Sequence, residues 1–274
     1  MTRPARRTGT FVVTREHRRF VEFADTVRRN ATIGLCHGRA GVGKTLSARR
    51  YARWDLIEPV VTDWGVRKSS DEKVYATVKR TRTLFYTPPV GSTIGAMRKD
   101  LQLPLDRLCN CIDIDTEPPH PIRRPLSFDP VELVIIDEAE RLNTTSLELL
   151  RDRFDRSNAG LILIGMPGIE KRLSRYPQLY SRVGFVHEYP LLSKDEMGFV
   201  LSRQWKRLGL DMDESDFTDT QAVSAIIRLT GGNFRLLQRL LAQIERIRRI
   251  NEIALITEEV VEAAAQTLVI GNAN

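Results

Sequence analysis

The 274-residue sequence contains few cysteines, no long apolar run and no low-complexity block, and each of these absences excludes a class of protein. The longest apolar stretches, such as residues 161–164, fall far short of the roughly 18 residues that span a bilayer. The N-terminal arginines are not followed by the apolar core of a signal peptide, so we expect neither a membrane protein nor a secreted one. The odd number of cysteines, Cys36, Cys109 and Cys111, has no C-x-x-C or histidine spacing, which argues against disulfides and zinc and is consistent with a reducing cytoplasm.

What is present is the composition of an ordinary globular protein, with 42% hydrophobic and 28% charged residues. A chain of this length forms one large domain, or a core domain with a smaller partner. The formal net charge of +7 comes from 42 lysines and arginines against 35 acidic residues. This excess points to a polyanion such as nucleic acid as a possible partner, but the acidic residues are interspersed, so charge alone leaves the question open.

The order of apolar runs predicts an α/β core followed by an all-helical part. Short apolar runs at 32–36, 133–136 and 160–164 are typical of parallel strands that are buried on both faces. Strands that alternate with amphipathic helices indicate a parallel-sheet αβα core. The pattern after residue 190 is wholly helical, with expected helices at 195–208, 220–229, 234–250 and 258–268.

These changes of pattern set the expected domain boundaries. We expect a basic N-terminal arm and helix at residues 1–30, an αβα core at 31–190 and a smaller all-helical domain at 191–274. Within the core, residues 55–130 hold most of the prolines, so long loops are expected there. A strand at 83–86 and a helix at 94–103 are expected to interrupt them.

One segment matches a phosphate-binding loop in full. The pattern G-x-x-x-x-G-K-[ST] lies between an expected strand and an expected helix, which is the context that the motif requires. Its residues are Gly38, Arg39, Ala40, Gly41, Val42, Gly43, Lys44 and Thr45. Glycines let backbone N–H groups curl around phosphates, Lys44 offers a positive charge to the β- and γ-phosphates, and Thr45 offers its hydroxyl to Mg²⁺. The motif predicts binding of a nucleoside triphosphate with Mg²⁺.

A second element follows the strand at 133–136, where Asp137 and Glu138 are adjacent. Asp137 would hold Mg²⁺ through its water shell, and Glu138 could polarise the attacking water. Acidic residues often end a strand at a protein surface, so the pair carries weight only together with the phosphate loop. The combination predicts an NTP-hydrolysing enzyme in which Lys44, Asp137 and Glu138 are catalytic.

Together with the helical C-terminal part, these motifs resemble those of the AAA+ ATPases, and more closely those of the transposition ATPases of the MuB, TniB and TnsC group. The matching pieces along the chain are 11–14, 38–45, 134–142, 161–165, 179–183 and 231–235. Residues 55–80 are not clearly matched. The resemblance implies an AAA+ P-loop fold with a helical lid, and ATP with Mg²⁺ as its ligands.

The resemblance also implies roles for residues outside the two motifs. Phe11 and Thr14 are placed at the nucleotide. Arg182 takes the place of an arginine finger, which reaches the γ-phosphate held by a neighbouring subunit, with Arg172 and Arg175 as nearby competitors. Arg235 takes the place of a second sensor, which reads the same phosphate from the lid. As an alternative, Arg182 or Arg235 is a solvated surface charge.

The family's biology is implied in the same way. ATP-bound subunits would assemble head to tail, as a filament or a ring, on double-stranded DNA without strong sequence preference. They would recruit a transposase, and possibly contact a target-selection protein, in a cytoplasmic, nucleoid-associated setting in bacteria. Thr93, Arg98 and Lys99 occupy the matching place after the strand at 83–86 and are the candidate DNA contacts. No carboxylate triad of a transposase can be assigned, so DNA cutting and joining would belong to a partner.

Met166 departs from the family pattern. AAA+ proteins usually place a polar residue that orients the lytic water after this strand, and a thioether cannot donate a hydrogen bond. We therefore expect slow hydrolysis that acts as a timed switch. A DNA-coating scaffold that binds ATP without turning it over stays open, as do another DNA-handling AAA+ role such as a helicase loader, and a P-loop small-molecule kinase.

Overall fold

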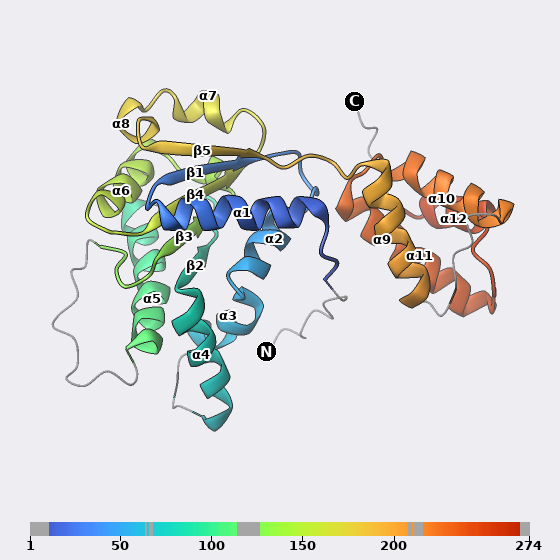
Figure 1. The fold of residues 1–274 in the computed structure, drawn as a ribbon, viewed down its shortest axis with the longest axis horizontal. Helices are drawn as coiled ribbons and strands as arrows, with labels where there is room; N and C mark the ends of the chain where they lie inside the picture. The colour runs from blue at the N-terminus through green and yellow to red at the C-terminus, as the bar shows by residue number, and fades with distance from the viewer. Residues whose placement is uncertain are drawn as a thin grey trace. The chain divides into compact units, whose positions relative to one another are not determined.

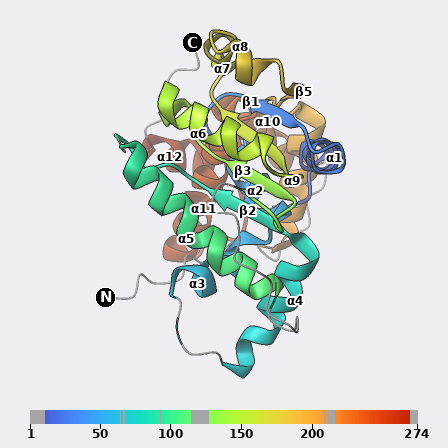
Figure 2. The same cartoon turned by 90° about the vertical axis from the view of Figure 1, so that its left-hand side faces the viewer.

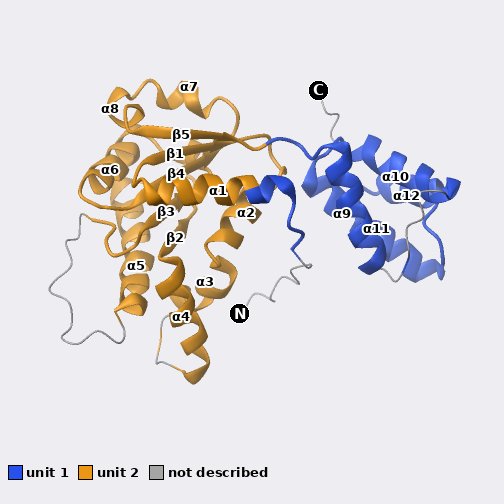
Figure 3. Ribbon diagram, in the orientation of Figure 1, with its two compact units in different colours: residues 1–18, 190–274 blue, residues 19–189 orange. Residues whose placement is uncertain are grey.

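The chain forms two compact units, residues 19–189 and residues 1–18 with 190–274 (Figure 3). Our computed structural model describes residues 11–63, 65, 68–91, 93–113, 127–207, 210 and 216–268. The start of the basic arm, residues 1–10, and the proline-containing stretch 114–126 lie outside the described residues. The boundary between the two units at residues 18 and 19 falls within the helix that the sequence analysis expected in the N-terminal arm.

The larger unit is built on a five-stranded parallel sheet in the order β2-β3-β4-β1-β5 (Figure 1). The strands are β1 (Ile33–His37), β2 (Thr83–Tyr86), β3 (Leu133–Ile136), β4 (Gly160–Gly165) and β5 (Val183–Glu188). Strands β3 and β4 are fully buried, as expected for continuous apolar runs in a parallel sheet. Sequence analysis did not identify β5, because this edge strand is mostly exposed and has no long apolar run.

Helices cover both faces of this sheet, with α1 on one face and α5 and α6 on the other (Figures 1 and 2). The helices of this part of the chain are α1 (Arg15–Arg29), α2 (Lys44–Tyr51), α3 (Trp54–Thr62), α4 (Glu72–Thr81), α5 (Ile94–Ile112), α6 (Thr144–Asp155), α7 (Ile169–Leu173) and α8 (Pro177–Tyr180), with short 3-10 turns η1 (Ser69–Asp71) and η2 (Ala139–Arg141). Helix α1 approaches β1 closely at Gly34, where an added Cβ would lie 2.5 Å from Val27 and 2.7 Å from Phe23. The expected αβα core is confirmed.

The expectation of long loops across residues 55–130 is wrong for most of its described part, because α3, α4 and α5 occupy it. Pro59 lies inside α3 and Pro104 inside α5, which continues to Ile112 rather than ending near residue 103. A proline costs a helix one backbone hydrogen bond, but Leu105 and Leu108 beyond it are buried in the core. Burial of these side chains offsets the lost bond and keeps the chain helical.

The smaller unit is a helical bundle around a core of its own. It contains α9 (Lys194–Arg207), α10 (Phe217–Thr230), α11 (Phe234–Asn251) and α12 (Glu258–Gln266). Trp205 is fully buried in this core, and Val12 from the N-terminal segment joins it. Gly231, with φ +53°, ends α10, and the Asn233 side chain caps α11 by accepting from the N–H groups of Arg235 and Leu236. The expected all-helical C-terminal part is confirmed, and no helix of the described residues is long and apolar enough to cross a membrane.

The extension of α5 past Pro104 can be tested with two leucines of the same helix. Leu105 is 2% exposed and Leu103 is 52% exposed. Leu105→Ala should lower the free energy of unfolding by about 2–5 kcal/mol, whereas Leu103→Ala should lower it by less than about 1 kcal/mol. Denaturant titrations followed by circular dichroism measure both changes. An equal loss of unfolding free energy in the two variants would show that Leu105 is not buried in the core.

Candidate active site

The phosphate-binding motif forms the connection between β1 and α2. Gly41 and Gly43 have φ angles of +82° and +114°, a region that favours glycine. Gly38 is required for another reason, because an added Cβ would lie 2.2 Å from the carbonyl oxygen of Tyr189. The Lys44 ammonium donates to the carbonyl oxygens of Gly38 at 2.5 Å and Arg39 at 2.9 Å, so its charge is held within the curl of the loop.

The other side chains of the loop differ in burial. Arg39 and Ala40 are exposed, whereas Val42 is buried and anchors the loop in the core. Helix α2 begins at Lys44, so its first N–H groups and the positive end of its dipole also face the loop. The arrangement fits a polyphosphate.

Tyr189 supports the loop, and sequence reasoning missed it. Its N–H donates to the carbonyl of His37 at 2.7 Å, and its hydroxyl lies 2.8 Å from that of Ser47 in α2. It therefore holds the strand before the loop and the helix after it in a fixed relation. The residue belongs to no motif, and the one available signal was an aromatic residue at the end of the core, just before Pro190.

The end of β3 reaches the same edge of the sheet as the phosphate loop. Thr45 donates its hydroxyl hydrogen to Asp137 Oδ2 at 2.8 Å, although the two residues are 92 positions apart. Asp137 is buried, and burial raises its pKa, while hydrogen bonds from Thr45 and from the Glu138 N–H lower it. A hydroxyl and a carboxylate are hard oxygen ligands of the kind that Mg²⁺ takes together with water and phosphate oxygens. Thr45 and Asp137 therefore fit the expected metal site.

Glu138 has a left-handed backbone, with φ +51°, which is uncommon for a residue with a side chain. Its carboxylate forms an ion pair with Arg141, and Arg141 also donates to the carbonyl oxygen of Pro88 at 2.9 Å. Sequence reasoning assigned Glu138 a role but missed Arg141. The signal was present, since Arg141 stands three residues after the acid in the same motif.

Met166 follows β4 at the place where the family carries a polar residue, and its side chain is 39% exposed. Close by, Glu140 Oε2 lies 3.0 Å from the position that a Cβ on Gly165 would take. A carboxylate therefore stands next to the end of β4, where Met166 itself cannot donate or strongly accept a hydrogen bond.

The three finger candidates differ in their surroundings. Arg172 donates to the backbone carbonyls of Glu140 and Leu142, which is a structural role. Arg175 is exposed. Arg182 forms a two-pronged ion pair with Asp155, with nitrogen to oxygen distances of 2.5 and 2.8 Å. To reach a phosphate on another subunit, Arg182 would have to exchange this partner.

Three predicted nucleotide contacts, Phe11, Thr14 and Arg235, belong to the smaller unit. Phe11 packs edge-on against His17, with ring centroids 4.7 Å apart, and the hydroxyl of Thr14 accepts from the His17 N–H. Arg235 is exposed in the first turn of α11. Their roles at the nucleotide stay predictions.

The candidate DNA contacts stand at the start of α5. Thr93 caps the helix, its hydroxyl accepting from the Ala96 N–H at 3.2 Å, and Arg98 and Lys99 are exposed. Pro89, Val90 and Gly91, which come before them, are also exposed, and Val90 is 81% accessible. The side chains are thus available to a partner, and their role stays a prediction.

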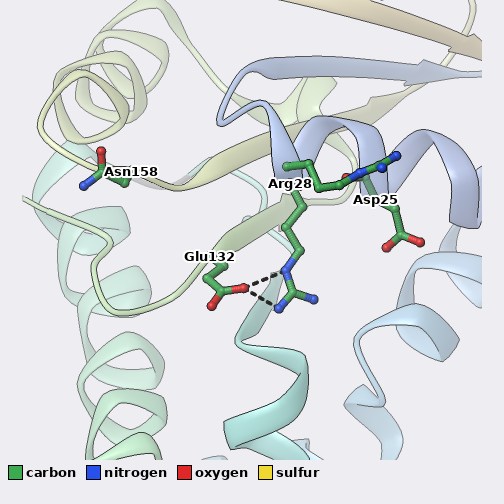
Figure 4. A pocket seen from close by; sticks show the side chains of 5 residues that line it. Asp25, Arg28, Glu132 and Asn158 are labelled. Atoms are coloured by element: carbon green, nitrogen blue, oxygen red, sulfur yellow. Dashed lines mark hydrogen bonds and ion pairs between the residues drawn. The ribbon is translucent and has the colours of Figure 1, made fainter.

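A pocket of about 600 Å³ lies at the opposite edge of the sheet, where β3 and β4 begin (Figure 4). It is lined by Asp25, Arg28, Arg29, Glu132 and Asn158. Arg28 donates to Glu132 at 2.8 Å, so its charge is compensated within the pocket. The pocket shares no residue with the phosphate loop and is no part of this site.

Comparison with known proteins agrees with this geometry. A family model described as an AAA domain matches residues 27–173. A Staphylococcus aureus protein described as a potential ATP-binding protein is 43% identical over 269 residues, which cover 95% of this chain and 97% of that protein. The chain belongs to the AAA domain family. Specific membership of the MuB, TniB and TnsC group is not established by these matches.

Solved structures show the same AAA+ fold. The Thermotoga maritima RuvB Holliday junction branch migration motor is 17% identical, with a TM-score of 0.58, and the match covers 95% of this chain and 71% of that one. The Aeropyrum pernix ORC2 protein in its ADP form is 14% identical, with a TM-score of 0.53, over 96% of this chain and 71% of that one. At such identities the likeness concerns the fold alone, and it supports the AAA+ P-loop architecture.

The close approach at Gly38 gives a direct test of the site. Gly38→Ala would push a methyl group into the Tyr189 carbonyl, so the loop has to shift, and nucleotide affinity should fall about tenfold or more. Gly95→Ala is the matched control, because nothing lies within 4 Å of its added Cβ. Titration with a fluorescent ATP analogue measures both. Unchanged affinity in the Gly38 variant would place nucleotide binding elsewhere.

Proposed function

We propose that this AAA domain protein is an ATP hydrolase that uses nucleotide turnover as a switch. The observation that carries the proposal is the meeting of Lys44, the Thr45–Asp137 pair and Glu138 at one edge of the sheet. Lys44 would neutralise the β- and γ-phosphates, and Thr45 and Asp137 would hold Mg²⁺, which withdraws charge from the phosphates when it is bound. Glu138 would accept a hydrogen bond from the attacking water.

Arginines would complete the site. Arg182 would supply positive charge to the γ-phosphate of a neighbouring subunit, once it has left Asp155, so that hydrolysis depends on assembly. Arg235 would read the same phosphate from the smaller unit. The exchange of Asp155 for a phosphate is electrostatically reasonable, because both partners present oxygens to the same two guanidinium nitrogens.

We further propose that the ATP-bound protein oligomerises on double-stranded DNA and recruits a transposase to target sites, with hydrolysis driving disassembly. Three features support this proposal: the sequence resemblance to transposition ATPases, the net charge of +7, and the exposure of Arg98 and Lys99 after β2. Contacts from such side chains are made to phosphates, so binding would be largely independent of sequence and sensitive to salt.

One observation favours a second function. Met166 cannot orient a water molecule by donating a hydrogen bond, so a scaffold that binds ATP and DNA without turnover is the competing proposal. Glu140 beside the end of β4 weighs against it, because its carboxylate could orient a water molecule by accepting a hydrogen bond from it. A helicase loader or a small-molecule kinase would share the phosphate loop and differ in the client or acceptor.

Electron microscopy and salt-dependent DNA binding test the proposal together. With a slowly hydrolysed ATP analogue, the protein should form oligomers on arbitrary duplex DNA, and these should be absent with ADP and for Lys44→Ala. Replacing Arg98 and Lys99 together by alanine should weaken binding and reduce the slope of log affinity against log salt by about 2.

The matched control removes two exposed charges elsewhere, at Lys206 and Arg207 of α9, and should leave the slope nearly unchanged. A protein that stays monomeric and ignores DNA in all nucleotide states would contradict the DNA proposal. In that case a P-loop enzyme with a small-molecule acceptor becomes the function to test.

A further inference from the structure

A pocket of about 330 Å³ lies in the larger unit at the carboxyl end of β2, between α2, α3 and α5. Its walls are aromatic, because Trp54 of α3 and Phe85 and Tyr86 of β2 line it. These three side chains are buried, whereas Leu103 of α5, at the rim of the pocket, is 52% exposed. The residues of the phosphate loop, Asp137 and Glu138 do not line this pocket, so the proposed ATPase activity leaves it unexplained.

The hydroxyl of Tyr86 lacks a hydrogen-bond partner within the described part of the chain. Tyr86 is only 8% exposed, so water does not readily replace the missing partner. Burial raises the pKa of this hydroxyl to about 12, and the negative charge of Asp100 adds to the shift, so the group keeps its proton at neutral pH. Buried hydroxyls are nearly always paired in folded proteins, because an unpaired one is unfavourable. A guest in the pocket that Tyr86 lines can supply the missing partner.

The arginines of the pocket are engaged in its walls, which argues against an anionic guest. Arg49 of α2 forms ion pairs with Asp55 and Glu58 of α3, at 2.7 and 2.5 Å. Arg107 of α5 donates to two backbone carbonyls in the last turn of α3, at 2.5 and 3.0 Å. These contacts tie α3 to both of its neighbours, so the pocket is preformed. Because both guanidinium groups serve this purpose, we expect a neutral guest rather than a phosphate.

We propose that this pocket binds a tyrosine side chain of a partner polypeptide. Its aromatic walls accept a ring in the offset or edge-to-face geometry that aromatic pairs prefer. A phenol oxygen accepts a hydrogen bond from the Tyr86 hydroxyl, whereas a phenylalanine ring would leave that hydroxyl unpaired. Aromatic anchors in desolvated pockets supply much of the affinity of protein interfaces. This inference goes beyond the proposed ATPase activity and does not rest on it.

Two features favour a polypeptide over a free small molecule. The volume of about 330 Å³ is at the lower end of the range for small-molecule sites, and it suits one aromatic side chain with its adjoining backbone. Leu103 gives the second argument, because a free ring inside the pocket would leave this exposed leucine in water. A chain that crosses the rim to deliver its tyrosine would cover it.

Fluorine NMR of the full chain labelled with fluorinated tryptophan tests the binding. Trp54 lines the pocket, and Trp205, in the core of the helical bundle, is the internal control. The probe is a glycine- and serine-rich peptide of about ten residues with one central tyrosine. The Trp54 resonance, assigned with Trp54→Phe, should shift saturably with this peptide, and the Trp205 resonance should not move.

The same peptide with phenylalanine in place of tyrosine tests the hydrogen bond. Its affinity should be about three- to tenfold weaker, the range that one hydrogen bond accounts for. Equal affinity for the two peptides, or a Trp54 resonance that responds to neither, would overturn the inference.

Tyr86→Phe tests the role of the hydroxyl directly. The substitution keeps the ring and removes an unpaired buried group, so the fold should persist and the preference for tyrosine should fall to less than about 1.5-fold. Tyr180→Phe, which removes a hydroxyl from a 40% exposed side chain of α8, is the matched control and should keep the full preference. A preference that survives in the Tyr86 variant would show that Tyr86 does not recognise the guest.

Leu103→Ala distinguishes a polypeptide from a free ring. It should weaken binding of the tyrosine peptide about twofold or more and leave binding of N-acetyltyrosinamide unchanged. Leu255→Ala, at a 61% exposed position in the smaller unit, should change neither. An amide that binds as tightly as the peptide, with no effect of Leu103→Ala, would contradict the polypeptide partner. None of these readouts needs ATP hydrolysis, so this inference and the proposed function fail independently.

Discussion

A hydrogen bond of 2.8 Å between Thr45 and Asp137 joins the two halves of the candidate site, and the other features of the larger unit serve to place its two ends. The parallel sheet brings the carboxyl ends of β1 and β3 to one edge, with β4 between them. Tyr189 fixes the strand and the helix on either side of the phosphate loop. Gly38 lets that loop pass the Tyr189 carbonyl at a distance that no side chain would allow. The result is a site in which the oxygens of Thr45 and Asp137 lie near the fixed ammonium of Lys44.

Much of this arrangement could be predicted from the sequence, because the responsible signals are local. The loop motif lies between an expected strand and an expected helix, and Asp137 and Glu138 follow an expected buried strand. In a parallel α/β fold the carboxyl ends of such strands meet at one edge of the sheet. The helical C-terminal part followed from the helical pattern of its apolar residues. These signals depend on neighbours a few positions apart.

The parts that escaped prediction depend on tertiary contacts. The prolines of residues 55–130, Pro104 among them, indicated loops, but burial of Leu105 and Leu108 keeps α5 helical. Strand β5 is identified by its pairing with β1, because its residues are mostly exposed. Tyr189, Asp155 and the bridge from Arg141 to Pro88 link distant or motif-free positions, which no pattern in one sequence reveals.

The most direct test of the account compares ATP binding with single-turnover hydrolysis in Glu138→Gln, with Glu148→Gln on α6 as the matched control. If Glu138 polarises the attacking water, its variant should bind ATP within about threefold of the wild type and hydrolyse it at least about a hundredfold more slowly. The control should match the wild type in both measurements. Hydrolysis that survives Glu138→Gln at the wild-type rate would contradict the central claim that this edge of the sheet is the catalytic site.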